Sequence, residues 1–220
     1  MTTRPPRRSP GRPSADRAVQ RDTLLDAALA CYVRQGIQAT SLRDIAREAG
    51  VTPAMLHYYF GDAAQLREAV IEERLMPVFE RIRTPLMSAA GDLPALLRLF
   101  VDGIFAVVQE YPWLPPMWVR EVVTEGGALR DLLMTRLAPS LGQLLAARFQ
   151  QAQAAGELNP ALDPRLLMVS LIGLTMFPVA GAPIWRQVFN AENLTMDDVR
   201  RHALVLLESG LELGDGKTLL

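Results

Sequence analysis

The stretch TSLRDIAREAGVTPAMLHYYFGD, residues 40–62, contains two short helical patterns separated by a glycine. Ser41 and Asp44 have the spacing of a capping box, so a first helix is expected to begin just after Ser41. Thr52 is a suitable N-cap for a second helix, and Pro53 suits its first position because proline lacks the N–H that would go unbonded there. Two short helices joined by a tight turn predict a helix-turn-helix.

The second helix of this pair holds four consecutive ring-bearing side chains, which one helical face cannot accommodate. A period of 3.6 residues divides the helix into a small or polar-tipped face and an apolar face. The small or polar-tipped face consists of Pro53, Ala54, His57 and Tyr58. The apolar face consists of Met55, Leu56, Tyr59 and Phe60. The apolar face is expected to pack inward, which leaves the other face outward.

The outward face has the character of a helix that enters the major groove of DNA, because small residues allow close approach and ring tips offer hydrogen bonds. Arg43 lies on the exposed side of the preceding helix, and Ser41 and Thr52 offer hydroxyls to phosphate. The candidate DNA-binding residues of this region are Ser41, Arg43, Thr52, Pro53, Ala54, His57 and Tyr58. Helix pairs with a glycine turn also occur as plain core hairpins, so the pattern alone leaves both interpretations open.

The segment TSLRDIAREAGVTPAMLHYYFGDAAQLREAV resembles the DNA-binding region of the TetR family of bacterial transcriptional regulators. The resemblance extends from about residue 20 to 70; beyond residue 75 it is one of helical layout only. It implies an all-α homodimer that binds a palindromic double-stranded DNA operator and releases it when a small molecule enters the C-terminal domain. Two departures stand out: the family usually has tyrosine at the position of His57, and often a phosphate-binding lysine at that of Ala63.

Charge is distributed unevenly along the chain. Residues 1–60 carry nine arginines and five acidic residues, a net charge of +4, whereas residues 61–220 carry 14 basic and 19 acidic residues, a net charge of −5. Residues 1–60 are the basic front of the chain, and residues 61–220 are its acidic body. This division favours binding of an anionic polymer at the basic front. Residues 1–16 are rich in proline and arginine and are predicted to be a disordered arm, with Arg12 as a candidate minor-groove contact. A non-specific solubilising tail remains the alternative.

The composition favours an all-α protein without catalytic or metal chemistry. Half of the residues are hydrophobic, and helix formers dominate the sequence. Cys31 is the only cysteine, which excludes an internal disulfide, and no clustered ligands predict a metal site. No catalytic constellation or phosphate-binding loop is present, so we expect neither an enzyme nor a cofactor.

The acidic body is rich in large apolar side chains that are candidates for an effector pocket. A proline-rich break at residues 111–116 favours a cavity, because helices diverge at such breaks. The candidate ligand-binding residues for a small apolar or aromatic effector are Phe105, Trp113, Met117, Trp118, Met134 and Phe177. For each of them, a place in a close-packed core is the alternative.

The most apolar segment, residues 166–185, is interrupted by Gly173, Pro178, Gly181 and Pro183. The run left between these breaks is shorter than the ~20 residues of a membrane span. We therefore expect a buried or interface helix, no membrane partner and a cytoplasmic protein. The helix predicted at 164–177 and the last predicted helix, residues 195–213, are the candidate homodimer surface.

The sequence thus predicts a disordered basic arm (1–16), a helix-turn-helix DNA-binding domain (17–61) and a helical effector-binding and dimerisation domain (62–220). The preferred function is a ligand-responsive transcriptional regulator, a repressor that a small apolar effector releases from its operator. The first alternative is a TetR-like DNA-binding protein without a small-molecule pocket, controlled by protein partners or acting architecturally. A carrier of apolar ligands that has lost DNA binding is a further alternative, which the basic front disfavours.

Overall fold

The structure, a computed structural model, describes residues 14–89 and 91–211 and contains only helices and turns within these ranges. The expectation of a basic arm falls mostly on residues 1–13, so Arg12 lies outside the described residues. Ser14, Ala15 and Asp16, which the sequence assigned to the arm, belong to the first turn of a helix. The chain divides into two units that meet between Leu75 and Met76.

The first unit is a helical domain built on a long first helix. Its elements are α1 (Ser14–Gln35), α2 (Leu42–Glu48), α3 (Pro53–Phe60), α4 (Ala63–Val70) and the π-helical turn η1 (Ile71–Leu75). α1 contacts α2, α4 and η1, and α3 contacts α2 and α4. The domain boundary predicted after residue 61 therefore falls inside this unit, because α4 packs on α1 and α3.

The short helices of the first unit begin and end at local signals. The capping box predicted for α2 is present, with the Ser41 hydroxyl accepting from Asp44 N and the Asp44 carboxylate accepting from Ser41 N. Asp62 caps α4 by accepting from Gln65 N at 2.8 Å. Gly50 and Gly61 have positive φ values of 66° and 82°, which explains the glycines at these turns.

The second unit is a larger bundle. Its elements are α5 (Met76–Ser88), α6 (Leu93–Glu110), α7 (Leu114–Trp118), η2 (Val119–Val123), α8 (Arg130–Leu132), η3 (Leu133–Leu137), α9 (Ala138–Ala154), α10 (Pro164–Ala180), α11 (Ala182–Phe189) and α12 (Met196–Leu211). α6 lies at its centre and contacts α5, α9, α10 and α12. Its nine buried apolar side chains make it the main support of the core.

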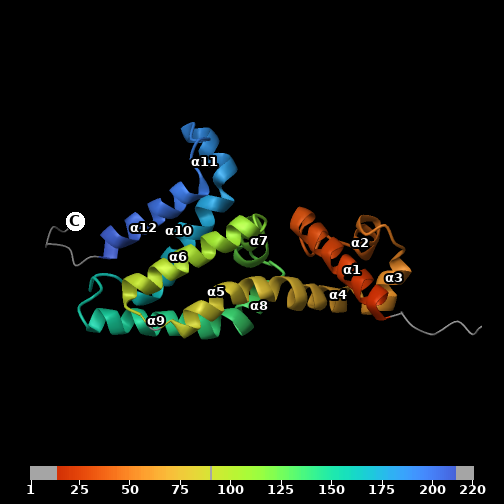
Figure 1. Ribbon diagram of the computed structural model, residues 1–220, viewed down its shortest axis with the longest axis horizontal. Helices are drawn as coiled ribbons and strands as arrows, with labels where there is room; N and C mark the ends of the chain where they lie inside the picture. Colours follow the sequence, from red (N-terminus) through yellow and green to blue (C-terminus); the bar gives the residue numbers. More distant parts are fainter. Residues whose placement is uncertain (1–13, 90, 212–220) are drawn as a thin grey trace, which may run out of the picture. The chain divides into compact units, whose positions relative to one another are not determined.

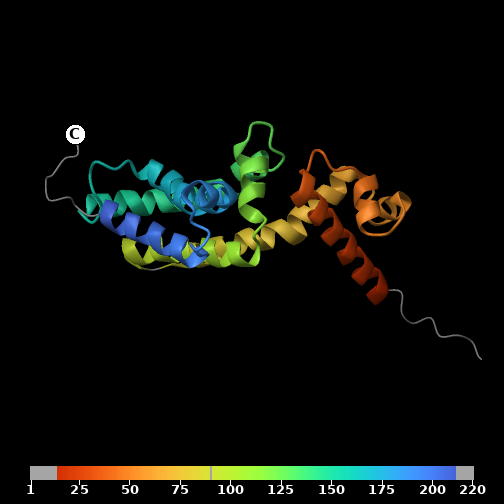
Figure 2. The ribbon, with the colours of Figure 1, turned by 90° about the horizontal axis from the view of Figure 1, so that it is seen from above.

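Two helical stretches of the second unit contain π-helical turns. α7 is followed directly by η2, and α8 is followed directly by η3 and then α9. The turn between them is anchored by the backbone N–H of Leu129, which donates to the carbonyl of Glu121 at 2.9 Å. Figure 2 shows this green turn at the tip of a protrusion.

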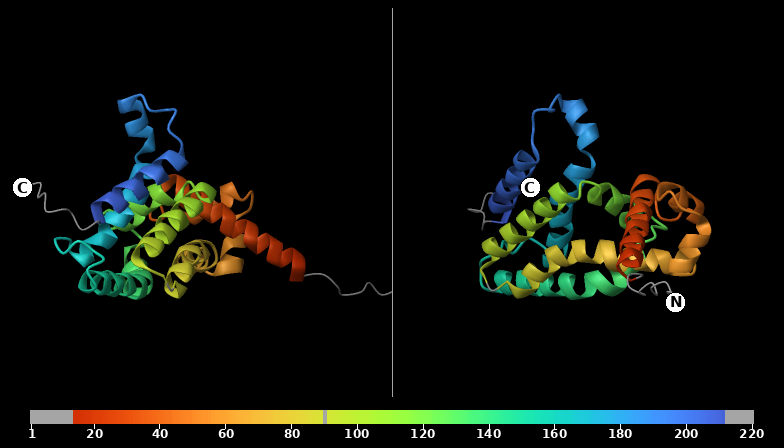
Figure 3. Two further views of the ribbon diagram at one scale, coloured as in Figure 1. Left: turned by 60° about the vertical axis from the view of Figure 1, so that its left-hand side comes forward. Right: turned by 45° about the vertical axis from the view of Figure 1, so that its right-hand side comes forward.

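The apolar segment 166–185 is less broken than its glycines and prolines suggest. α10 continues through Gly173 and Pro178 and ends at Ala180. α11 then follows; it has no buried residue and projects from the rest of the second unit (Figure 3). The indole N–H of Trp185 donates to the carbonyl of Pro178 at 2.6 Å, which ties α11 to the end of α10. This bond satisfies a carbonyl near the bend between the two helices.

No single helix in the described ranges is long and apolar enough to cross a bilayer. α10 and α11 together meet the criteria of length and composition, but they are bent by 73° at the break between them.

Candidate nucleic-acid interface and ligand cavity

The burial of α3 follows the division predicted for its two faces. Leu56 and Phe60 are 1% and 6% exposed, whereas Tyr58 is 66% exposed. Met55 and Tyr59 are half-buried, and the other residues of the predicted DNA face, Pro53, Ala54 and His57, are exposed. Packing of the apolar back of α3 thus presents the opposite face to solvent.

Hydrogen bonds fasten the half-buried side of α3 to α1. The Tyr59 hydroxyl donates to Gln20 Oε1 at 3.0 Å, and Gln20 Nε2 contacts the sulfur of Met55 at 3.1 Å. The guanidinium of Arg21 lies 5.1 Å from the ring centroid of Phe60. Gln20 and Arg21 were not singled out from the sequence, because no local pattern links a residue of α1 to one about 40 positions later.

His57 contributes to the end of α3 as well as to its exposed face. Its Nδ1 lies 2.6 Å from the carbonyl oxygen of Gly61. Because a carbonyl oxygen only accepts, Nδ1 is the donor, and in the neutral ring Nε2 is left as an acceptor. The tautomer of this exposed side chain is therefore set by the turn that follows the helix.

Ser41 and Thr52, whose hydroxyls are expected to lie near phosphate, differ in the hydrogen bonds that they make within the protein. The Ser41 hydroxyl donates to Asp44 Oδ2 at 2.6 Å, so its proton is already engaged. This bond, together with the one from the Ser41 N–H, lowers the pKa of Asp44. Thr52 is the N-cap of α3 by position, but its hydroxyl makes no capping bond and stays exposed. The sequence did not separate these two cases, because both residues occupy N-cap positions.

Two exposed arginines lie on the helices around α3. Arg43 on α2 has no ion-pair partner among the described residues, whereas Arg47, one turn later, pairs with Asp44 at 2.9 Å. Arg17 on α1 lies with its guanidinium carbon 4.9 Å from the ring centroid of Tyr58. Cation–π contact of this kind holds a positive charge beside the exposed ring.

Ion pairs join α1 to η1 on another part of the first unit. The two terminal nitrogens of Arg21 each contact one Glu73 oxygen at 2.6 Å. Arg74 pairs with Asp26 at 2.6 Å and with Asp22 at 3.2 Å. Such bidentate and shared pairs fix geometry better than single exposed pairs do.

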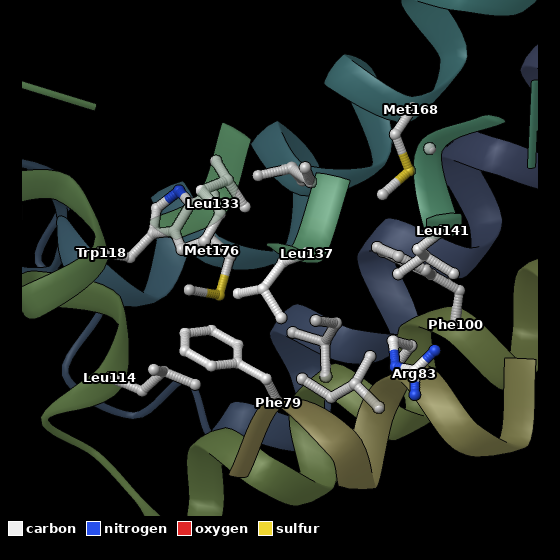
Figure 4. A pocket seen from close by; sticks show the side chains of 14 residues that line it. Phe79, Arg83, Phe100, Leu114, Trp118, Leu133, Leu137, Leu141, Met168 and Met176 are labelled. Atoms are coloured by element: carbon white, nitrogen blue, oxygen red, sulfur yellow. The ribbon is translucent and has the colours of Figure 1, made fainter. Parts of the chain in front are cut away.

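The second unit contains a cavity of about 190 Å³ between α5, α6, α7, η3, α9 and α10. Its walls are almost entirely apolar, and Arg83 is the one charged residue among the described residues that line it. The lining consists of Phe79, Ile82, Arg83, Phe100, Ile104, Leu114, Trp118, Leu133, Leu137, Leu141, Gly142, Met168, Ile172 and Met176. In the view of Figure 4, Trp118 and Leu133 lie at one end and Arg83 and Phe100 at the other.

Of the six residues predicted to bind a ligand, Trp118 lines this cavity. Phe105 and Met117 are 1% and 2% exposed and belong to the close-packed interior, and Trp113 is half-buried against the core. Met134 and Phe177 point to solvent, with exposures of 63% and 72%. An apolar residue type does not reveal whether its helix turns it toward a cavity, a core or the surface.

No group of three or more histidine, cysteine, aspartate or glutamate side chains in the described ranges is arranged to hold a metal ion.

The fold and the exposed face of α3 define a helix-turn-helix protein. Residues 24–70 match the family described as "Bacterial regulatory proteins, tetR family". Over 150 residues the chain is 33% identical to the HTH-type transcriptional regulator SrpR of Pseudomonas putida, and this alignment covers 68% of each chain. The chain belongs to the TetR family.

Two further similarities concern regulators called KstR2. The chain is 33% identical over 90 residues to the HTH-type transcriptional repressor KstR2 of Mycolicibacterium smegmatis, which covers 41% of this chain and 44% of that relative. The match therefore spans less than half of the relative's length. The structure of the ketosteroid transcriptional regulator KstR2 of Mycobacterium tuberculosis aligns with a TM-score of 0.65 at 20% identity, covering 89% of this chain and 96% of that one. This likeness supports the fold.

The Arg21–Glu73 pair predicts a measurable acid sensitivity of the first unit. The hydrogen bonds from Arg21 hold the pKa of Glu73 below its usual value of 4.5. A lowered folded-state pKa stabilises the fold above about pH 4.5, and this contribution is lost as the pH falls. Both side chains are about a third exposed, so the contribution is expected to be less than about 1 kcal/mol.

Urea unfolding at pH 7 and pH 3 checks this expectation. Arg21→Met and Glu73→Gln should each lose stability at pH 7 and show a smaller difference between the two pH values than the original chain. Arg98→Met, which removes the exposed pair with Glu208 in the second unit, controls for the loss of one arginine. An equal pH difference in the original chain and in both variants would refute the assignment.

Proposed function

We propose that this protein is a ligand-responsive DNA-binding transcriptional regulator, which binds a palindromic operator as a homodimer and leaves it when a small apolar effector binds. The observation that carries this proposal is the exposed face of α3, held outward by the burial of Leu56 and Phe60. Membership of the TetR family supports the same function. A regulator that its effector displaces from the operator is expected to repress transcription while it is bound to DNA.

The DNA contacts follow from the chemistry of the exposed face. Pro53 and Ala54 are small enough for the start of α3 to approach base edges closely, and Tyr58 and His57 extend from the same face. His57 Nε2 accepts a hydrogen bond in the neutral ring, so its partner would be a donor such as adenine N6 or cytosine N4. Thr52, Arg43 and Arg17 would contact phosphates, which position the helix without reading sequence.

A dimer is supported by apolar stripes on two helices that contact each other, α10 and α12. On α10, Leu166, Val169 and Phe177 are 60%, 64% and 72% exposed, and on α12, Val205 and Leu206 are 54% and 46% exposed. Exposed apolar stripes of this kind are typical of a protein interface. A twofold dimer would place two copies of α3 in successive major grooves, about 34 Å apart.

The cavity in the second unit supports control by a small molecule. It has a volume of about 190 Å³, less than the several hundred cubic ångströms typical of drug-sized ligands. An apolar cavity of about 150 Å³ is large enough for benzene. The effector that fits without further opening is therefore about the size of one substituted aromatic ring. The presence of this cavity favours ligand control over a TetR-like protein without a pocket.

The DNA contacts are tested by substitutions on the exposed face. Tyr58→Ala and His57→Ala should each weaken operator binding about tenfold or more. Tyr58→Ala should leave the melting temperature nearly unchanged because the side chain is exposed, whereas His57→Ala also loses the bond to the Gly61 carbonyl and should lower it slightly. Arg43→Ala should weaken binding and reduce the slope of log affinity against log salt by about one. Fluorescence anisotropy on a duplex selected from a random DNA pool measures all three, with Arg130→Ala on α8 as the control. Undiminished affinity in the three variants would contradict the assigned face.

The proposed dimer surface is tested by placing a charge on each stripe. Val169→Glu and Val205→Glu should convert the dimer into monomers in sedimentation velocity and weaken operator binding in parallel. Val123→Glu is the matched control, because Val123 on η2 is 60% exposed and lies outside the two stripes. Dimers that persist in both stripe variants would place the interface elsewhere.

The cavity is tested by filling it from one wall. Gly142 lines it within α9, and a Cβ at this position would meet no neighbouring atom within 4 Å. Gly142→Leu should therefore keep the fold and operator binding while raising the dissociation constant of small aromatic ligands at least about tenfold. Gly103→Ala, in α6 and likewise without neighbours, is the control. Calorimetry measures binding; unchanged ligand affinity in Gly142→Leu would refute the cavity as the effector site.

A further inference from the structure

The effector cavity has one charged residue in an otherwise apolar wall. Arg83, on α5, is the charged member of the 14 lining residues. Its side chain is 33% exposed, so the guanidinium keeps some contact with solvent while its stem lies against the cavity. The carboxylate that pairs with Arg83 within the chain engages only part of the guanidinium.

Glu80 engages one edge of the Arg83 guanidinium. Arg83 Nε lies 2.9 Å and 3.0 Å from the two carboxylate oxygens of Glu80, one turn earlier on α5. One of these oxygens also accepts from the Thr84 hydroxyl at 3.1 Å. The bond from Arg83 lowers the pKa of Glu80, so the pair is ionised at neutral pH.

The terminal nitrogens of Arg83 remain available. A guanidinium carries five N–H donors, of which Nε supplies one and the two terminal nitrogens supply four. Neither terminal nitrogen makes a hydrogen bond to any residue in the described ranges. Two parallel N–H groups on this edge match the two oxygens of a carboxylate.

We infer that the effector is an apolar monocarboxylate of about one aromatic ring, whose carboxylate pairs with the terminal nitrogens of Arg83. This inference rests on the proposed role of the cavity as the effector site and adds the chemical class of the ligand. The apolar part extends from Arg83 and Phe100 toward Trp118 and Leu133, the other end of the lining (Figure 4). Glu80 offsets the charge of Arg83 and so limits the affinity of the site for the anion.

A different role for Arg83 makes a different prediction. If its stem only covers the cavity edge and its head only reaches water, as long basic side chains often do, a ligand's charge has no effect on binding. The comparison of an acid with its neutral amide of the same shape separates the two roles, since the hydrophobic contribution is nearly equal for both.

The probes are 3-phenylpropionate and 3-phenylpropionamide, titrated calorimetrically into the full-length chain at pH 7 without DNA. In the original chain the acid should bind about tenfold more tightly than the amide, the effect of a charge-assisted hydrogen-bonded pair. Arg83→Gln should abolish this preference, so that acid and amide bind with nearly equal affinity. Glu80→Gln, which removes the neighbouring negative charge, should strengthen acid binding about threefold without changing amide binding.

The outcomes separate this inference from the proposed function. Equal binding of acid and amide, unaffected by Arg83→Gln, overturns the carboxylate assignment and leaves the apolar cavity intact as a site. Binding of neither probe overturns both the assignment and the cavity's role as effector site, while DNA binding is measured separately. If Arg83→Gln does not fold, the Glu80→Gln comparison decides: an unchanged ratio of acid to amide affinity overturns the inference.

Discussion

The burial of one side of α3 is the constraint on which the proposed function depends. An eight-residue helix is too short to be stable alone in water, so it persists only because Leu56 and Phe60 are buried within the first unit. That same burial turns Tyr58 and His57 outward. The bond between Tyr59 and Gln20 adds a directional constraint to the apolar contact, so the rotation of α3 about its axis is held by both.

The second unit has a continuous apolar core and, beside it, a cavity where the helices do not pack closely. α6 packs against α5, α9, α10 and α12 and buries its apolar side chains among them, so it forms the stable centre of the bundle. Beside it, α7 passes into η2 and α8 passes into η3, and lining residues Trp118, Leu133 and Leu137 lie in or next to these π-helical turns. π-helical turns shift side chains out of regular register and are frequent at functional sites. The cavity therefore lies where the helices depart from regular geometry.

Two polar features give the proposed functions their chemical selectivity. His57 is held in one tautomer by the Gly61 carbonyl, which determines whether its outer nitrogen accepts or donates. Glu80 engages the Nε of Arg83, a residue that lines the apolar cavity, and the terminal nitrogens make no hydrogen bond to any described residue. In both cases a structural hydrogen bond uses one edge of the side chain and orients the other edge for a ligand.

The sequence by itself determined the helix-turn-helix, the capping of α2, the two faces of α3 and the family. These features depend on signals three or four residues apart, such as Ser41 with Asp44 or Leu56 with Phe60, which fold locally in the same way in many contexts. Only the tertiary structure decided the cavity, because its lining comes from helices as distant as α5 and α10. It turned Trp118 inward and Met134 and Phe177 outward, and it left the terminal nitrogens of Arg83 without a hydrogen-bond partner among the described residues. An apolar or charged residue type specifies a preference for burial or exposure, whereas the neighbour it meets depends on how distant helices pack.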